Sequence, residues 1–360
     1  MGVGPPALEN LVTGGDFWSG KRVLLTGHTG FKGSWLAFWL ASRGARVTGY
    51  ALAPATQPSL WELLQLADVG DLRADVRDLA AVSRAYQEVR PEVVLHVAAQ
   101  SLVRSSYDDP VGTYATNVMG TVNVLEAARQ SAGTRVVLVV TSDKCYENRE
   151  TDEAYRETDA MGGRDPYSSS KGCAELVTAA YRSSFSAGKA IASVRAGNVI
   201  GGGDWAVDRL LPDLVRAVVR GEAALIRNPA AVRPWQHVLE PLSGYLLLAE
   251  RLWHDSESFA GGWNFGPPLE DAVAVQELAD AFVHAWGAPA RWQADRGAHP
   301  HEARFLKLDA AKARNVLGWT PRLRLREAIA WTADWYKKQS SGASAKSLCL
   351  SQIEQYAKLA

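Results

Sequence analysis

A strand, a glycine-rich turn and a helix follow one another between residues 22 and 40. The apolar run 23–25 predicts a buried strand, and the spacing of apolar side chains in 35–40 predicts a helix. Between them, glycines allow backbone amides to approach an anion closely, and the start of the helix offers unpaired N–H groups to the same anion. This order favours a nucleotide-phosphate site over a plain tight turn. It assigns nucleotide contacts to Gly27, Thr29, Gly30, Phe31, Lys32 and Gly33.

Strand-like and helix-like segments alternate up to about residue 200. Such alternation is typical of parallel βαβ units, so we predict an α/β fold with a Rossmann-type, doubly wound parallel sheet. Glycines and prolines become frequent after residue 196, where we expect a smaller C-terminal α/β substrate lobe. The predicted divisions are a flexible leader at 1–19, a Rossmann domain at 20–195 to which part of 232–262 returns, the substrate lobe at 196–335, and a tail at 336–360 that is mobile or docks on a partner.

The charge balance and the cysteines exclude several classes of protein. Lysine and arginine together number 39, as do aspartate and glutamate, so the 360-residue chain has no net charge and no global attraction to nucleic acid or an anionic membrane. No uninterrupted run of about 18 apolar residues predicts a membrane span. The three cysteines form no CxxC pair or disulfide pattern, which suits a reducing compartment. We therefore expect a cytoplasmic protein without a metal, a nucleic-acid partner or a membrane partner.

Further segments are expected to face the nucleotide. Neither an acidic residue nor an arginine follows the strand predicted at 46–51, which weighs slightly toward NAD over NADP. Asp75, followed by Val76, is equally suited to bind an adenine amino group or to cap a turn. Ala98 and Ala99 follow another buried strand, and their small side chains leave room for a flat cofactor.

Two polar residues interrupt otherwise regular segments. Asn117 enters a predicted helix, where a side-chain amide marks a bend or a water-relay position near the cofactor. His96 lies within an apolar strand, and a histidine in such a position is more often a hydrogen-bonded core residue than a ligand. We therefore assign Asn117 to the cofactor site and His96 to the core.

The apolar run 136–140 predicts a strand whose end carries reactive side chains. These side chains are Ser142, Asp143 and Lys144. Ligands bind beyond the carboxyl ends of strands in open α/β sheets, which places all three at the expected site.

Tyr167 and Lys171 are four residues apart and so face the same side of a helix. A lysine ammonium beside a phenol lowers the tyrosine pKa from about 10 toward neutrality, which makes the tyrosine a base for an alcohol proton.

These features together resemble the extended short-chain dehydrogenase/reductase superfamily over about residues 20–335. The residues that carry the resemblance are Gly27, Gly30, Gly33, Asn117, Ser142, Tyr167 and Lys171. Longer stretches, at 28–35, 142–146, 195–205 and 233–238, resemble the CDP-glucose 4,6-dehydratase family. That resemblance implies a lyase of deoxysugar biosynthesis that holds NAD tightly and converts CDP-glucose to CDP-4-keto-6-deoxyglucose by internal hydride transfer and loss of water. It also implies a homodimer.

The resemblance further implies roles for individual side chains. Tyr167, helped by Lys171 and Ser142, would take the proton of the sugar 4-hydroxyl, and Tyr167 and Lys171 would also contact the cofactor. Asp143 would protonate the departing 6-hydroxyl, which requires a raised pKa. Lys144 stands where relatives carry a glutamate base. It must be neutral to accept a proton, or it acts through its charge while another group takes the proton.

Substrate contacts are implied for Gln100, Asn198, Arg209, Arg233 and His301. Arg233 is the strongest candidate for the diphosphate, because a guanidinium binds two phosphate oxygens at once. Without the family match, Arg209 would be equally well a solvated charge and Asn198 a turn residue. His301 is assigned to a loop near the substrate and not to a metal site.

Two other functions fit the sequence less well. A nucleotide-sugar epimerase, or a dehydratase of another nucleotide sugar, would share the fold, but an epimerase needs no acid such as Asp143 for a leaving hydroxyl. A non-catalytic NAD-binding protein would have no need of Ser142, Tyr167 and Lys171.

Overall fold

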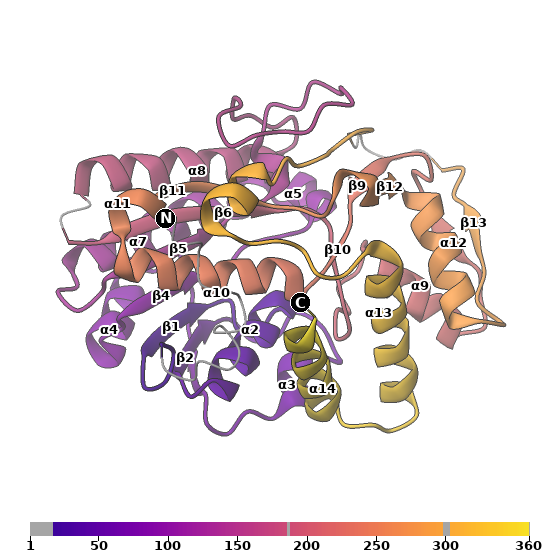
Figure 1. Cartoon of the computed structure of the whole chain (residues 1–360), viewed down its shortest axis with the longest axis horizontal. Coiled ribbons are helices and arrows are strands. Elements are labelled where there is room, and N and C mark those ends of the chain that lie inside the picture. Colours follow the sequence, from indigo (N-terminus) through magenta and orange to yellow (C-terminus); the bar gives the residue numbers. More distant parts are fainter. Residues whose placement is uncertain (1–16, 186–187, 298–302, 360) are drawn as a thin grey trace, which may run out of the picture.

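The computed structural model describes residues 17–185, 188–297 and 303–359. Within these residues, seven parallel strands form a central sheet in the order β11–β6–β5–β4–β1–β2–β3, with helices on both faces (Figure 1). The strands are β1 (Arg22–Thr26), β2 (Arg46–Ala51), β3 (Gly70–Arg73), β4 (Val93–His96), β5 (Val136–Val140), β6 (Ala190–Ala196) and β11 (Gly261–Phe265). The predicted α/β class with a Rossmann-type parallel sheet is confirmed.

The two faces of the sheet are covered by different helices. Helices α2 (Phe31–Ser42) and α10 (Leu239–His254) pack on one face, whereas α4 (Leu79–Val89), α7 (Gly120–Gln130) and α8 (Pro166–Phe185) pack on the other. Successive strand residues point to opposite faces, so Val23 and Leu25 join the core beneath α2 and α10, while Leu24 joins the opposite core. Burial on both faces explains why the central strands are almost entirely apolar.

Shorter elements connect these layers and build the second part of the chain. Around the first part lie α3 (Leu60–Leu64), α5 (Val103–Asp108), α6 (Pro110–Tyr114), the π-helical segment η1 (Ala115–Met119) and the 3₁₀ helix η2 (Asp143–Cys145). The second part contains β7 (Val199–Ile200), α9 (Leu210–Val219), β8 (Ala224–Ile226), β9 (Val232–Pro234), β10 (Gln236–His237), α11 (Ser256–Phe259), η3 (Leu269–Asp271), β12 (Ala272–Ala274), α12 (Val275–Trp286), β13 (Trp292–Ala294), η4 (Ala313–Leu317), α13 (Leu325–Ser340) and α14 (Ala345–Lys358).

The chain returns to the central sheet after it has entered the second part. Helix α10 packs against β5 and β6, and β11 adds a parallel strand beside β6. Small two-stranded pairings, β7 with β10, β9 with β12 and β8 with β13, lie outside the sheet. The division at residues 195 and 196 stays a prediction, as does the leader, of which residues 1–16 lie outside the described ranges.

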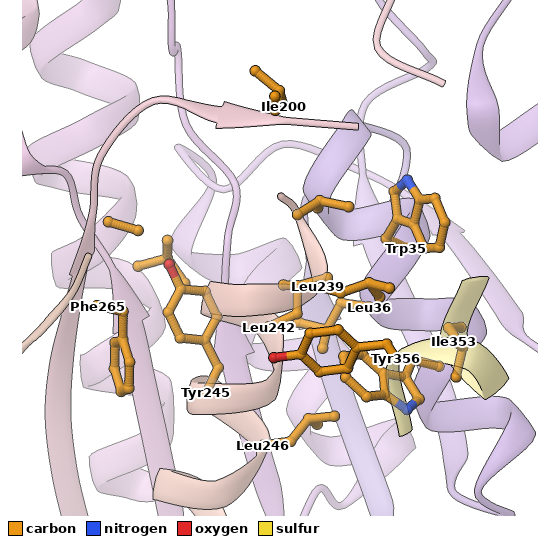
Figure 2. Close-up of a cluster of buried hydrophobic side chains, with 14 of the residues drawn as sticks. Trp35, Leu36, Ile200, Leu239, Leu242, Tyr245, Leu246, Phe265, Ile353 and Tyr356 are labelled. Atoms are coloured by element: carbon orange, nitrogen blue, oxygen red, sulfur yellow. The ribbon is translucent and has the colours of Figure 1, made fainter. Parts of the chain in front are cut away.

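The C-terminal segment folds against its own chain, which corrects the expectation of a tail that is mobile or docks on a partner. Figure 2 shows Ile353 and Tyr356 beside Trp35 and Leu36 in the core between α2 and α10. The Tyr356 hydroxyl donates a hydrogen bond to Glu240 Oε2 at 2.8 Å. The low mean apolarity of this segment hid its role, because only one face of α14 is buried.

His96 is a core residue, as the sequence predicted. Its Nδ1 lies 2.7 Å from the hydroxyl of Thr26 and its Nε2 lies 3.1 Å from the hydroxyl of Thr121. Burial lowers the pKa of His96 to about 3, so the ring is neutral and both of its nitrogens have partners.

Candidate active site

A cavity of about 700 Å³ opens beyond the carboxyl ends of the central strands. The turn after β1 and the segments after β4, β5 and β6 form one side of it, and residues of the second part, including 203–214 and 224–228, form the other. Open α/β sheets bind ligands at this edge. The cavity therefore lies between the ends of the central strands and the second part of the chain.

The glycine-rich turn forms one end of the cavity. Gly27 has a φ of +77°, and a Cβ there would lie 2.6 Å from the backbone nitrogen of Ala98. A Cβ on Gly33 would clash with the carbonyl oxygen of Gly27. Glycine is thus required at both positions for the turn to approach the next strand and for α2 to begin at the cavity. The predicted residues that line this end are Gly27, Thr29, Gly30, Phe31, Lys32 and Gly33. A crowded glycine turn before a helix N-terminus fits a pyrophosphate.

The next side of the cavity is formed by small or polar residues that the sequence assigned to the cofactor: Asp75, Val76, Ala98 and Ala99. The Asp75 carboxylate accepts hydrogen bonds from the backbone N–H of Arg77 at 2.9 Å and from Arg77 Nη2 at 2.6 Å. Hydrogen bonding by Arg77 lowers the pKa of Asp75. The side chain therefore caps its own turn while it faces the cavity, and its contact with a cofactor stays a prediction.

Asn117 and Gln100, both within the described residues, are not among the residues that line the cavity, and their contacts with ligands stay predictions. Asn117 Oδ1 accepts from the backbone N–H of Gln100, and Asn117 Nδ2 donates to Gln100 O and to Ser170 Oγ. The Gln100 amide is in turn bonded to Leu102 and Thr113. These amides are satisfied by the protein itself, so Asn117, in the π-helical segment η1, holds the loop after β4 against α8.

Ser142, Asp143 and Lys144 form the turn directly after β5, which we call the catalytic turn (Ser142–Cys145). Ser142 Oγ donates to Asp143 Oδ1 at 2.9 Å and accepts from the backbone N–H of Lys144 at 3.2 Å. Asp143 is 2% exposed, and its Oδ2 has no hydrogen-bond partner among the described residues. Burial raises the pKa of Asp143, although the charge of Lys144, the hydrogen bond from Ser142 and the charges of Arg233 and Lys32 oppose the shift. A carboxyl group in this position is suited to keep a proton and donate it.

Tyr167 and Lys171 lie in the first turns of α8 and both line the cavity. Burial raises the pKa of Tyr167 to about 12, against the opposing effect of a hydrogen bond with Ser142. Lys171 Nζ donates to the carbonyl oxygen of Val140 at 3.2 Å, and burial lowers its pKa to about 8. The expectation that Lys171 lowers the pKa of Tyr167 toward neutrality is therefore wrong for this structure, because burial dominates and the ammonium is bonded elsewhere.

Lys32, at the end of the glycine-rich turn, interacts through its charge with Asp143 in the catalytic turn. The sequence did not indicate this interaction. Burial lowers the pKa of Lys32 to about 8, and the charge of Arg209 lowers it further, whereas Asp143 and Asp204 oppose the shift. The charge of Lys32 also lowers the pKa of Lys171. These neighbours come from distant segments, so no local motif marks the position.

The far side of the cavity contains Asn198 and Arg209, as predicted. Arg209 Nη1 donates to Asp204 Oδ2 at 2.9 Å, and its Nη2 donates to Ser101 Oγ at 2.8 Å. Arg209 is thus a held cation and not a freely solvated charge. The sequence analysis did not identify Asp204 and Ser101 as partners of Arg209. The only indication was that Asp204 is an acidic residue close to Arg209 in the sequence.

Arg233 also lines the cavity and is 4% exposed. Its Nη1 donates to the carbonyl oxygen of Val232 at 2.9 Å, and its Nη2 donates to that of Ala303. These carbonyls hold the guanidinium while its charge acts on Asp143. His301, the remaining predicted substrate contact, lies outside the described residues.

Two structural findings concern partners. None of the described helices combines the length and the apolar character needed to cross a membrane. Within the same ranges, no group of three or more His, Cys, Asp and Glu side chains could hold a metal ion. The expected absence of metal and membrane partners stays a prediction.

A family model described as GDP-mannose 4,6 dehydratase matches residues 24–332. The CDP-glucose 4,6-dehydratase of Salmonella typhimurium is 53% identical over 330 residues, which cover 89% of this chain and 92% of that protein. The epimerase Mth375 of Methanothermobacter thermautotrophicus superposes with a TM-score of 0.81 at 22% identity, covering 92% of this chain and 96% of that one. The UDP-glucose 4-epimerase of Thermus thermophilus, solved as a complex with NAD, gives 0.74 at 26% identity, covering 88% and 99%.

The parallel sheet, the glycine-rich turn and the Ser142, Tyr167 and Lys171 side chains define an extended short-chain dehydrogenase/reductase. Within that class, the chain belongs to the GDP-mannose 4,6-dehydratase family, whose members include the 53% identical CDP-glucose 4,6-dehydratase. The resemblance inferred from the sequence is confirmed. The Mth375 epimerase, at 22% identity, is evidence for the fold alone.

Proposed function

We propose that the chain is a lyase that converts CDP-glucose to CDP-4-keto-6-deoxyglucose in deoxysugar biosynthesis. The observation that carries the proposal is the buried Asp143, whose pKa is raised and whose Oδ2 has no hydrogen-bond partner among the described residues, in a cavity that also contains Tyr167. Removal of the sugar 6-hydroxyl needs a proton donor of this kind, whereas epimerisation at C4 does not. The name of the 53% identical relative supports CDP-glucose as the substrate.

NAD is the proposed cofactor, held by the glycine-rich turn, the start of α2 and the small residues Ala98 and Ala99. The Thermus thermophilus relative is itself a complex with NAD. When bound, NAD supplies the acceptor for the hydride of sugar C4 and later its donor to C6. The protein positions that exchange through the residues that line the cavity.

We assign the redox half of the reaction to Tyr167, Ser142 and Lys171. Tyr167, as its phenolate, takes the proton of the 4-hydroxyl and becomes a neutral phenol. The Ser142 hydroxyl stabilises the phenolate before this transfer, consistent with its lowering effect on the pKa of Tyr167. Lys171 supplies positive charge close by. Because burial raises the pKa of Tyr167 to about 12, the phenol must lose its own proton before it can act as this base.

We assign the dehydration half to Asp143 and Lys144. Oxidation at C4 makes the C5 proton acidic. A water molecule takes this proton, and the 6-hydroxyl leaves as water with the proton of Asp143. Lys144, whose charge is the largest electrostatic effect opposing the raised pKa of Asp143, stabilises the negative charge that develops as the C5 proton departs. In this proposal Lys144 acts through its charge and is not the group that accepts the C5 proton.

Arg233, Arg209 and Asn198 are the proposed contacts of the substrate diphosphate. In both guanidinium groups the two terminal nitrogens donate to protein partners, which holds the groups at the cavity wall without requiring the substrate to order them. Fixed cations of this kind bind phosphate oxygens with little loss of conformational freedom.

A homodimer is also proposed, on the basis of exposed apolar side chains on neighbouring helices α6, η1 and α8. These side chains are Val111, Tyr114, Met119, Leu176 and Phe185. Sedimentation of the wild-type protein and of Leu176→Glu tests this surface; a dimer that persists in the variant at the same concentration contradicts it. The cytoplasmic location stays a prediction.

The function is tested by incubating the NAD-loaded protein with CDP-, dTDP-, UDP- and GDP-glucose in heavy water, followed by mass spectrometry. We expect CDP-glucose to give a product lighter by one water, with solvent deuterium at C5. Turnover of another nucleotide sugar in preference would refute the proposed substrate. An unchanged mass across the panel would refute dehydration, and epimerised sugar would favour the competing function.

A further inference from the structure

A buried ion pair lies directly beneath the catalytic turn. Glu175 on α8 and Arg195 on β6 have side chains that are 4% and 5% exposed, and Arg195 Nη2 lies 2.7 Å from Glu175 Oε2. Glu175 follows Lys171 by one helical turn and Tyr167 by two, so all three face the same side of α8. No step of the proposed reaction uses Glu175 or Arg195.

Glu175 and Lys171 hold consecutive residues at the end of β5. Lys171 Nζ donates to the carbonyl oxygen of Val140, and the Thr141 hydroxyl donates to Glu175 Oε1. The Ser193 hydroxyl donates to Glu175 Oε2 at 2.6 Å. Two side chains of α8, one turn apart, therefore fix the helix against the two residues that precede Ser142.

Arg195 reaches the other end of the catalytic turn. Its Nη1 donates to the hydroxyl of Tyr146 at 2.7 Å, and its guanidinium lies 5.1 Å from the centre of the Tyr146 ring. The Tyr146 hydroxyl donates to Asn264 Oδ1 on β11 at 2.6 Å. The ion pair thus contacts Thr141 immediately before the catalytic turn and Tyr146 immediately after it.

We propose that Glu175 and Arg195 are a positioning pair that aligns Tyr167 and Lys171 on α8 with the catalytic turn. This inference rests on the proposed function. Stability alone does not account for the pair, because the desolvation of two buried charges offsets much of their attraction, and well-packed apolar side chains often serve as well. The contacts on both sides of the catalytic turn give the pair a geometric task that apolar side chains would not perform.

The charge of Glu175 also acts on Lys171. The charged or titratable groups that face Lys171 are Lys32 on α2, Cys145 in η2, His96 on β4 and Glu175 on α8 itself. Burial and Lys32 lower the pKa of Lys171, whereas Glu175 and Cys145 raise it. Loss of the Glu175 charge should therefore lower the pKa of Lys171 further and make the ammonium lose its proton at a lower pH.

The test is Glu175→Gln, which keeps the shape of the side chain but removes its charge. We expect kcat to fall on the order of tenfold to a hundredfold while KM changes by less than about twofold, because alignment is lost but the substrate contacts remain. The alkaline limb of the pH profile of kcat should move to lower pH. Asp334→Asn, which breaks an exposed pair with Lys338 on α13, is the control and should change neither quantity.

A wild-type kcat and an unshifted alkaline limb in folded Glu175→Gln would overturn the proposal, whatever the effect on melting temperature. If this variant does not fold, Tyr146→Phe replaces it, since that change removes one hydroxyl and leaves the ion pair intact. A several-fold fall in kcat at unchanged KM then supports the proposal, and an unchanged kcat overturns it. Failure of the proposed function is distinguishable, because wild-type protein would then leave CDP-glucose unchanged.

Discussion

The catalytic turn and the layer beneath it each bury a carboxylate, with opposite results. Asp143 has one oxygen without a hydrogen-bond partner among the described residues, and burial raises its pKa. Burial acts in the same direction on Glu175, but the hydrogen bond and charge of Arg195, followed by hydrogen bonds from Ser193 and Thr141, lower its pKa. The surroundings of the two groups, and not their depth, decide which one can carry a proton.

This difference shows how one fold separates reactive from positioning groups. A buried carboxylate with all its partners in place is held as an anion and fixes its neighbours, whereas one with few partners is poised to bind a proton. Thr141 donates a hydrogen bond to Glu175 and precedes Asp143 by two residues, so the same short segment links the two carboxylates. We therefore expect substitution of Asp143 to affect mainly the reaction rate, and substitution of Glu175 to affect also the free energy of unfolding.

The largest effect is expected for Tyr167→Phe, which leaves both carboxylates in place. Loss of the proton acceptor should slow reduction of bound cofactor on the order of a thousandfold. A stopped-flow record of absorbance at the wavelength of the reduced nicotinamide measures this step after mixing with CDP-glucose. Reduction at the wild-type rate would show that another group takes the 4-hydroxyl proton.

Asp143→Asn should slow elimination on the order of a hundredfold or more but leave cofactor reduction intact. Because the folded protein raises the pKa of Asp143, its ionised form costs stability as the pH rises above about 4, so the variant should melt at the same or a higher temperature than wild type at neutral pH. Transient accumulation of reduced cofactor, with little deuterium at C5, would report the block. Wild-type product formation would remove Asp143 from the mechanism.

Glu175→Ala should show the opposite pattern in stability. It leaves Arg195 buried without its carboxylate, which is expected to cost about 3–5 kcal/mol in the free energy of unfolding. Urea titration followed by circular dichroism measures the loss. Asp334→Ala, which removes an exposed pair with Lys338, is the control and should cost less than about 1 kcal/mol. Equal losses in the two variants would remove the contrast between the buried layer and the surface.

The smallest expected effect is the pH dependence of wild-type kcat. Lys171 is charged below a pKa of about 8 and loses its proton as the pH rises through that value. The raised pKa of Asp143 keeps its proton to a higher pH than an ordinary carboxyl, but that proton is also lost on the alkaline side. We therefore expect kcat to decline as the pH rises through about 8; a constant kcat up to about pH 10 would contradict the role of the Lys171 charge.

Local patterns predicted most of one side of the site. The glycine-rich turn, the start of α2 and the end of β5 are each continuous in sequence, so Gly27, Gly33 and Asp143 could be placed without knowledge of distant contacts. The sheet class followed in the same way from the alternation of apolar strands with helices. The family resemblance, and not geometry, supplied the substrate and the assigned roles.

Local patterns could not show where distant residues bind the same side chain. Asn117 and Gln100 carry amides suited to a ligand, but backbone groups and Ser170 occupy them. The Tyr167 and Lys171 spacing was read correctly as one helix face, yet burial raises the pKa of Tyr167 and lowers that of Lys171. The amphipathic pattern of residues 348–359 was visible in the sequence, but not that its apolar face packs on the core of the same chain.

The sequence by itself determined the parallel fold, the cofactor turn and the order Ser142, Asp143, Lys144 at a strand end, because backbone sterics and apolar periodicity act over a few residues. The tertiary structure alone decided which buried carboxylate has partners. Arg195, Ser193 and Thr141 reach Glu175 from β6 and the end of β5, and nothing in the described chain reaches Asp143 Oδ2. The pKa of a buried group depends on such long-range neighbours, which no local pattern encodes.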